Sequence, residues 1–176
     1  STKKSLNLWF SDFIIVLIPN YLIKILIKII AINTVTVNMK LFLDCEFNGF
    51  GGELISMALV DENERYFYEV LPCINPTSWV LDNVIPILNK QTIDLKEFQN
   101  TLFKFLNHYE TIHIVADWPE DFSLFLTSLI IKQGSCMITP KLTMELWNSD
   151  ASLAAESRIP HNALQDAFAL KRKYVI

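Results

Sequence analysis

Short apolar runs separated by polar turns organise the chain from residue 39 onward. They predict three consecutive strands over residues 40–47, 53–60 and 65–71, because strands are short, apolar and bounded by turn residues. The glycine-rich segment 48–52 forms the first turn, and the polar segment 61–64 joins the last two strands as a hairpin. Three antiparallel strands in a row are therefore expected.

Apolar residues recur at spacings of three and four in the second half, which predicts helices. A short helix is expected near residues 80–89. A longer one begins after Asp94, whose side chain caps it, and Glu97 completes a capping box. The expected apolar stripe of this helix consists of Leu95, Phe98, Leu102, Phe105, Leu106 and Tyr109.

A buried strand over residues 111–116 leads into another helix, which has Pro119 in its first turn. Gly134 is placed to end this helix. The buried face of the helix is expected to consist of Phe122, Phe125, Leu126, Leu129 and Ile130.

The last part of the chain predicts a strand around residues 136–139, an irregular stretch over 142–159, and a helix from Pro160 to about Tyr174. The element order is then β-β-β-α-β-α-β-α. Three antiparallel strands followed by strands that alternate with helices predict an α/β domain with a mixed sheet flanked by helices. Residues 39–176 are enough for one such domain with a sizeable core.

Residues 1–38 differ in kind from the rest, because isoleucine fills nine of the nineteen positions from Ile14 to Ile32. The longest uncharged run, residues 13–23, has eleven residues, short of the about 20 that span a bilayer. Three interpretations of this hydrophobic extension stay open: a translated leader ahead of a natural start at Met39, a membrane-associating helix, or an extra packed element. Membrane association is expected only through this segment.

The charge of the chain restricts how it can bind nucleic acid. The formal net charge is −4, and residues 1–38 carry four lysines against one aspartate, so the remainder has a charge of about −7. A general basic field for a polyanion is therefore absent, and bound metal ions would have to supply the attraction. The three cysteines are widely spaced and predict reduced packing residues of a cytoplasmic protein.

Two acids stand in the first apolar strand, at Asp44 and Glu46. Because side chains alternate along a strand, both carboxylates share one face, roughly 7 Å apart. Two interpretations are open at this point. The acids bind a hard divalent cation, or they lie at a strand end and are hydrated.

More acids occur after the buried strand 111–116 and on the last helix. Asp121 lies one turn into its helix and can face the sheet, whereas Asp117 and Glu120 are expected to act mainly as helix cap and capping-box partner. Asp166 lies on the apolar stripe of the last helix, and His161 precedes it at the start of that helix. A capping histidine and a solvated acid are the structural alternative.

The motifs Asp44-x-Glu46, Asp117-x-x-x-Asp121 and His161-x-Ala163-x-x-Asp166 occur in this order. Together they resemble the DEDDh 3′–5′ exonucleases of the RNase H-like superfamily. The runs MKLFLDCEFNGFGGELISMALVD and HNALQDA are most similar to the small, RNase T-like exoribonuclease branch of bacteria and phages. The resemblance spans nearly all of residues 39–174, and nothing in residues 1–38 belongs to it.

The resemblance implies an RNase H-like fold and a metal centre. It makes Asp44, Glu46, Asp121 and Asp166 the ligands of two Mg²⁺ or Mn²⁺ ions, and His161 the general base. Relatives often carry asparagine at the position of Asp117, which leaves open whether this residue adds to the metal site.

The expected function is metal-dependent 3′–5′ exonuclease hydrolysis of single-stranded RNA or DNA, with RNA favoured, to nucleoside monophosphates. Phe47, Phe50 and Trp118 flank the acids and offer a surface on which a terminal base can stack, although core packing is the alternative for Phe47. The last helix is short, and packing against a second copy in a homodimer would stabilise it.

Two alternatives to this function remain. One is a catalytically silent module of the same fold that binds nucleic acid or protein. The other is an enzyme that hydrolyses a different phosphoester, such as a nucleotide or a capped end.

Overall fold

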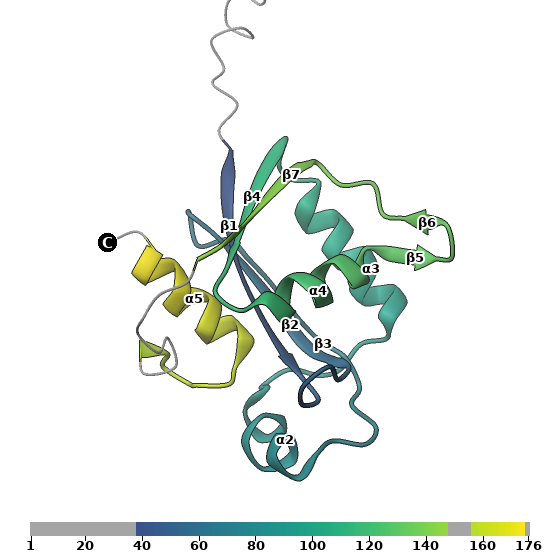
Figure 1. The fold of residues 1–176 in the computed structure, drawn as a ribbon, viewed down its shortest axis with the longest axis vertical. Coiled ribbons are helices and arrows are strands. Elements are labelled where there is room, and N and C mark those ends of the chain that lie inside the picture. The colour runs from purple at the N-terminus through teal and green to yellow at the C-terminus, as the bar shows by residue number, and fades with distance from the viewer. Residues whose placement is uncertain (1–37, 148–155, 175–176) are drawn as a thin grey trace, which may run out of the picture. The chain divides into compact units, whose positions relative to one another are not determined.

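The computed structural model describes residues 38–147 and 156–174. These residues form a five-stranded mixed sheet with helices on both faces and a separate two-stranded hairpin (Figure 1). The prediction of an α/β domain with a mixed sheet is confirmed. The predictions for residues 1–37 lie outside the described residues. Within the described part, no helix is both long and apolar enough to cross a membrane.

The sheet is built around its central strand, β1. The five strands are β1 (Met39–Phe47), β2 (Leu54–Asp61), β3 (Tyr66–Val70), β4 (Thr111–Ala116) and β7 (Lys141–Leu146). Their spatial order is β3-β2-β1-β4-β7. The first three strands pair antiparallel, β4 pairs parallel with β1, and β7 pairs parallel with β4. As a result, β1 is hydrogen bonded on both sides.

The helices cover both faces of the sheet. They are α2 (Ser78–Asn83), a 3₁₀ turn (Ile85–Ile87), α3 (Leu95–Leu106), α4 (Pro119–Ser128) and α5 (Ala163–Tyr174). Leu41 and Leu43 of β1 pack with α3 and α4 on one face, while Phe42 packs with α5 on the other (Figure 1). This alternation is the consequence of the two-residue period of a strand.

Helix α3 begins as its sequence predicts. The Asp94 carboxylate accepts a hydrogen bond of 2.8 Å from the backbone N–H of Glu97. Phe98, Leu102 and Leu106 are fully buried. The placement of Leu95 in the buried stripe is wrong, because Leu95 is 55% exposed.

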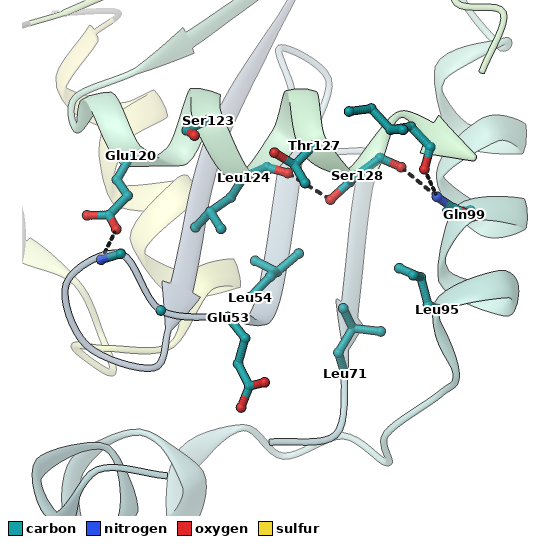
Figure 2. A pocket seen from close by; sticks show the side chains of 13 residues that line it. Glu53, Leu54, Leu71, Leu95, Gln99, Glu120, Ser123, Leu124, Thr127 and Ser128 are labelled. Atoms are coloured by element: carbon teal, nitrogen blue, oxygen red, sulfur yellow. Dashed lines mark hydrogen bonds between the residues drawn. The ribbon is translucent and has the colours of Figure 1, made fainter. Parts of the chain in front are cut away.

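The end of α4 differs from the prediction. The helix ends at Ser128, because the Gln99 side chain of α3 donates hydrogen bonds to the carbonyls of Ser128 and Ile130 (Figure 2). The chain then forms the hairpin of β5 (Ile130–Lys132) and β6 (Ser135–Cys136). Gly134 therefore does not end a helix but turns this hairpin, at φ +74°. Leu126 and Ile130, expected to be buried, are exposed.

The strand predicted around residues 136–139 is also misplaced. Only Cys136 of that range is in a strand, β6 of the small hairpin. The sheet is instead extended by β7, in a region expected to be irregular. Most side chains of β7 are exposed, so this edge strand lacks the apolar run that marks a buried one.

We predict that Asp94→Ala lowers the free energy of unfolding by about 1 kcal/mol, because the substitution removes the N-cap acceptor of α3. Urea denaturation of the two proteins measures the change. Lys96→Ala is the control, since Lys96 is exposed in the same helix and should change stability by less than about 0.5 kcal/mol. Equal stability of Asp94→Ala and the parent chain would contradict the capping role.

Candidate metal centre

Strand β1 supplies the first two acids of the centre. Asp44 and Glu46 lie on the same face as Phe42, whereas Leu41, Leu43 and Cys45 enter the core on the other face. The register between β1 and β2 shifts between Glu46 and Phe47. The extra residue is Ile55 of β2, because Glu46 pairs with Ser56 and Phe47 with Leu54. Such a bulge bends the strand that carries it, so the irregularity next to the second acid belongs to β2, and β1 stays paired through Phe47.

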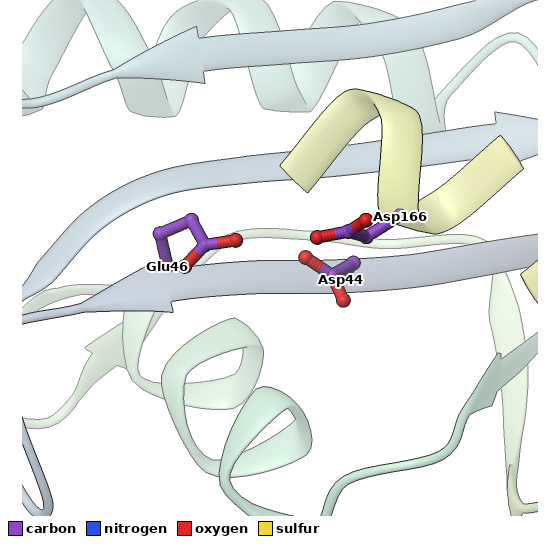
Figure 3. Close-up of side chains that lie close together, drawn as sticks. All are labelled: Asp44, Glu46 and Asp166. Carbon is purple, nitrogen blue, oxygen red and sulfur yellow. The ribbon is translucent and has the colours of Figure 1, made fainter. Parts of the chain in front are cut away.

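Helix α5 brings a third acid to these two. Carboxylate oxygens of Asp44, Glu46 and Asp166 all lie within 4.8 Å of one another. Figure 3 shows the three side chains turned toward one another, two from β1 and one from the first turn of α5. Asp166 thus faces the sheet, as the spacing of the last helix predicts.

Asn162 holds the start of α5 in place. Its side-chain N–H₂ donates to the carbonyl of Ile87 and to the hydroxyl of Tyr68, and its Oδ1 accepts from the backbone N–H of Gln165. Asn162 is 4% exposed and caps this helix, the role that the structural alternative gave to His161. The capping role of His161 is therefore wrong.

His161 instead lies beside the acids in a left-handed conformation, at φ +65°. Its backbone N–H donates to Oδ2 of Asp166 at 2.9 Å. Its ring meets the edge of Trp79 of α2, with the ring centroids 4.9 Å apart. Trp79 is 52% exposed. It was not among the predicted site residues, because it lies in a short helix with no motif of its own.

The turn between β4 and α4 supplies a second group of acids. Carboxylate oxygens of Asp44, Asp117 and Asp121 lie within 4.8 Å of one another. Asp121 is 2% exposed. The expected capping box is wrong: Trp118 occupies the N-cap position of α4, and no side chain caps that end.

Glu120 has a different role from the one expected. Its carboxylate accepts a hydrogen bond of 2.6 Å from the backbone N–H of Gly51 (Figure 2). This bond joins α4 to the glycine-rich turn that follows β1. It lies at the rim of a cavity of about 530 Å³ whose apolar lining includes Leu54, Leu71, Leu95 and Leu124.

The three aromatic residues proposed to stack on a base have different environments. Phe50 is 96% exposed in the turn after β1, and Trp118 is 54% exposed between β4 and α4. Phe47 packs against the main core. Phe50 and Trp118 are thus accessible to a ligand, and the packing alternative applies to Phe47.

No protein-family model matches the chain, and no curated protein matches it either.

Burial and mutual repulsion disfavour ionisation of the clustered acids. Burial raises the pKa of Asp44 well above its usual range, and the charges of Asp121 and Glu46 raise it further. Burial, with a contribution from Asp166, raises the pKa of Glu46 to about 8. For Asp121, burial and the charge of Asp117 outweigh a hydrogen bond from the backbone N–H of Cys45, so its pKa is also well raised.

This donor set fits a hard divalent cation. All five groups are carboxylates, which Mg²⁺, Mn²⁺ and Ca²⁺ prefer over softer ligands. Oδ2 of Asp44 and Oδ1 of Asp166 are buried without a hydrogen-bond partner in the described part of the chain. Buried acceptors without a donor are costly, and a bound cation would satisfy both.

We predict that Glu46→Gln stabilises the metal-free protein at high pH. The folded-state pKa of Glu46, about 8, lies above its usual value of 4.5. The stability that Glu46 contributes is therefore fully present below about pH 4.5 and is lost as pH rises through about 8. In EDTA at pH 8.5, the variant should exceed the parent chain by more than about 1 kcal/mol, the equivalent of one pKa unit.

Urea denaturation in EDTA at pH 4.5 and pH 8.5 tests this pH dependence. The gain from Glu46→Gln should shrink at the lower pH. Glu110→Gln removes a carboxylate outside the cluster and serves as the control, with no comparable gain. An identical gain at both pH values would refute burial of Glu46 as its cause.

Proposed function

We propose that this protein is a metal-dependent 3′–5′ exonuclease that hydrolyses single-stranded nucleic acid, with RNA favoured, to nucleoside monophosphates. The main support for the proposal is that two clusters of acids share Asp44. One consists of Asp44, Glu46 and Asp166, and the other of Asp44, Asp117 and Asp121. Two divalent cations joined by a common carboxylate are a known arrangement for phosphodiester hydrolysis. Asp44, Glu46, Asp121 and Asp166 are the proposed ligands.

The architecture supports an RNase H-like fold within the DEDDh family. Three antiparallel strands are followed by β4 and β7, both parallel to β1, in the order β3-β2-β1-β4-β7. The acids come from the central strand, from the carboxyl end of β4 and from the last helix. The carboxyl ends of parallel strands are where open crevices form in α/β sheets.

The proposal gives the cations and His161 different roles in the reaction. When bound, the cations supply an activated water and stabilise the charge that develops on the phosphate and the leaving oxygen. With the cations in place, His161 would accept the proton of the attacking water as the general base. The hydrogen bond from its backbone to Asp166 fixes its position beside the acids.

The acids also account for substrate binding by a domain of negative charge. Residues 39–176 carry a net charge of about −7, which repels a phosphate chain unless cations reverse the local sign. Phe50 and Trp118, which flank the acids in the sequence, are exposed and offer stacking surfaces for a base. The proposed partner is therefore the 3′ end of a single strand with the cations in place.

The observations disfavour a silent binding module. A module that does not cut has no chemical need for several carboxylates within 4.8 Å of one another, because their repulsion destabilises the metal-free fold. An enzyme for another phosphoester would use the same centre, and the substrate test distinguishes it.

We predict that the full chain degrades 5′-labelled single-stranded RNA and DNA in Mg²⁺ or Mn²⁺ as a ladder that shortens from the 3′ end. Gel electrophoresis over time measures the ladder. EDTA should abolish cleavage, because the acids alone cannot activate water. Cation binding without cleavage of either polymer would favour the binding module.

Asp44→Ala should abolish cleavage while the protein stays folded, because the substitution removes a ligand shared by both groups together with a source of repulsion. Circular dichroism checks the fold. Normal cleavage by Asp44→Ala would contradict the role of Asp44 as a ligand of the two cations.

His161→Ala should lower kcat by about 10²–10⁴-fold, the usual contribution of a general base. Cation binding should be kept, because His161 is in neither acidic group. His108→Ala, in the turn that follows α3, is the control and should cut at the parent rate, because His108 is in neither acidic group. Unchanged kcat in His161→Ala would exclude the base role.

A further inference from the structure

Asp117 lies in the short connection between β4 and α4. The strand ends at Ala116 and the helix begins at Pro119. Trp118 between them is extended, at φ −122° and ψ 130°, as expected for a residue before proline. This connection brings Asp117 and Asp121, four residues apart, to the same carboxylate of Asp44.

The carboxylate of Asp117 is not used as a helix cap, because no side chain caps the start of α4. The charge of Lys173 acts on Asp117, but the Lys173 ammonium also lies 3.6 Å from the carboxylate of Glu156. One shared ammonium cannot neutralise the three acids of this group.

The group contains a buried acceptor in need of a partner. Oδ2 of Asp44 is buried and has no hydrogen-bond partner among the described residues, and the neighbouring Asp121 is 2% exposed. Figure 3 shows one oxygen of Asp44 turned toward Asp166 and the other turned away from it. Asp44 can thus serve both acidic groups at once.

When all the acids are ionised, two divalent cations balance the charge of the centre better than one. The two groups together contain five carboxylates, with Asp44 counted once. One divalent ion would leave three negative charges in this partly buried site, whereas two would leave one. Buried charges without a counter-charge are strongly disfavoured.

We propose that Asp117 is a direct ligand of the second divalent cation, which Asp44, Asp117 and Asp121 hold together. This inference rests on the proposed function and adds a ligand to its metal centre. It assigns a role to a position at which the resemblance leads one to expect asparagine. The second ion is then held by three carboxylates and should bind even without substrate.

The test is the binding of Mn²⁺ to the full chain without nucleic acid, by isothermal titration and electron paramagnetic resonance. The parent chain should bind two ions, with the spin coupling of a close pair. In Asp117→Asn, affinity for the second ion should fall at least about tenfold, and the coupling should be lost. The first ion should keep its affinity.

Two further variants separate a ligand role from a general charge effect. Glu120→Gln removes a carboxylate three residues away that bonds to Gly51 and belongs to neither group, so it should still bind two ions. Asp166→Asn should weaken the first ion and spare the second, because Asp166 belongs only to the other group.

Two ions of unchanged affinity in Asp117→Asn would overturn the assignment and leave the proposed function standing. A parent chain that binds no ion would overturn the proposed function as well. If Asp117→Asn does not fold, Asp117→Cys decides: a ligand at this position should shift the second site toward Cd²⁺ over Mn²⁺, because thiolate prefers soft ions. No shift would overturn the assignment.

Discussion

Electrostatic repulsion among carboxylates at the end of β1 is the constraint on which the site depends. Asp44 belongs to two groups of acids whose oxygens lie within 4.8 Å of one another. Burial raises the pKa of Asp44, and its neighbours raise it further. A fold that brings these groups together without a cation loses stability as they ionise. A cation bound among these acids would therefore stabilise the fold.

The rest of the domain holds the acids against that repulsion. β1 is central in the sheet and hydrogen bonded to β2 and β4. Leu41 and Leu43 are fully buried on one of its faces, so the strand cannot move to relieve crowding on the other. Asn162 ties the start of α5 to the segment before α3, and Glu120 ties α4 to the turn after β1. Each element that carries an acid is thus fixed by a contact outside the acidic groups.

Much of the fold was predictable from local patterns. The strands β1 to β4 were expected within one or two residues, because each is a short apolar run between polar turns. The start of α3 followed from Asp94 and Glu97, which lie three residues apart. By contrast, β7 and the end of α4 were missed. The first is an edge strand with mostly exposed side chains, and the second depends on hydrogen bonds from Gln99 of another helix.

The sequence by itself determined which acids could act together, since alternation places Asp44 and Glu46 on one face and helical spacing places Asp166 on the sheet side of α5. The tertiary structure alone decided that Asp117 joins Asp44 and Asp121, and that Trp79 meets His161. The physical reason is that the sequence pattern carries information about local structure only. Periodicity describes the direction of a side chain from its own strand or helix, whereas a site made from several elements depends on how those elements pack against one another.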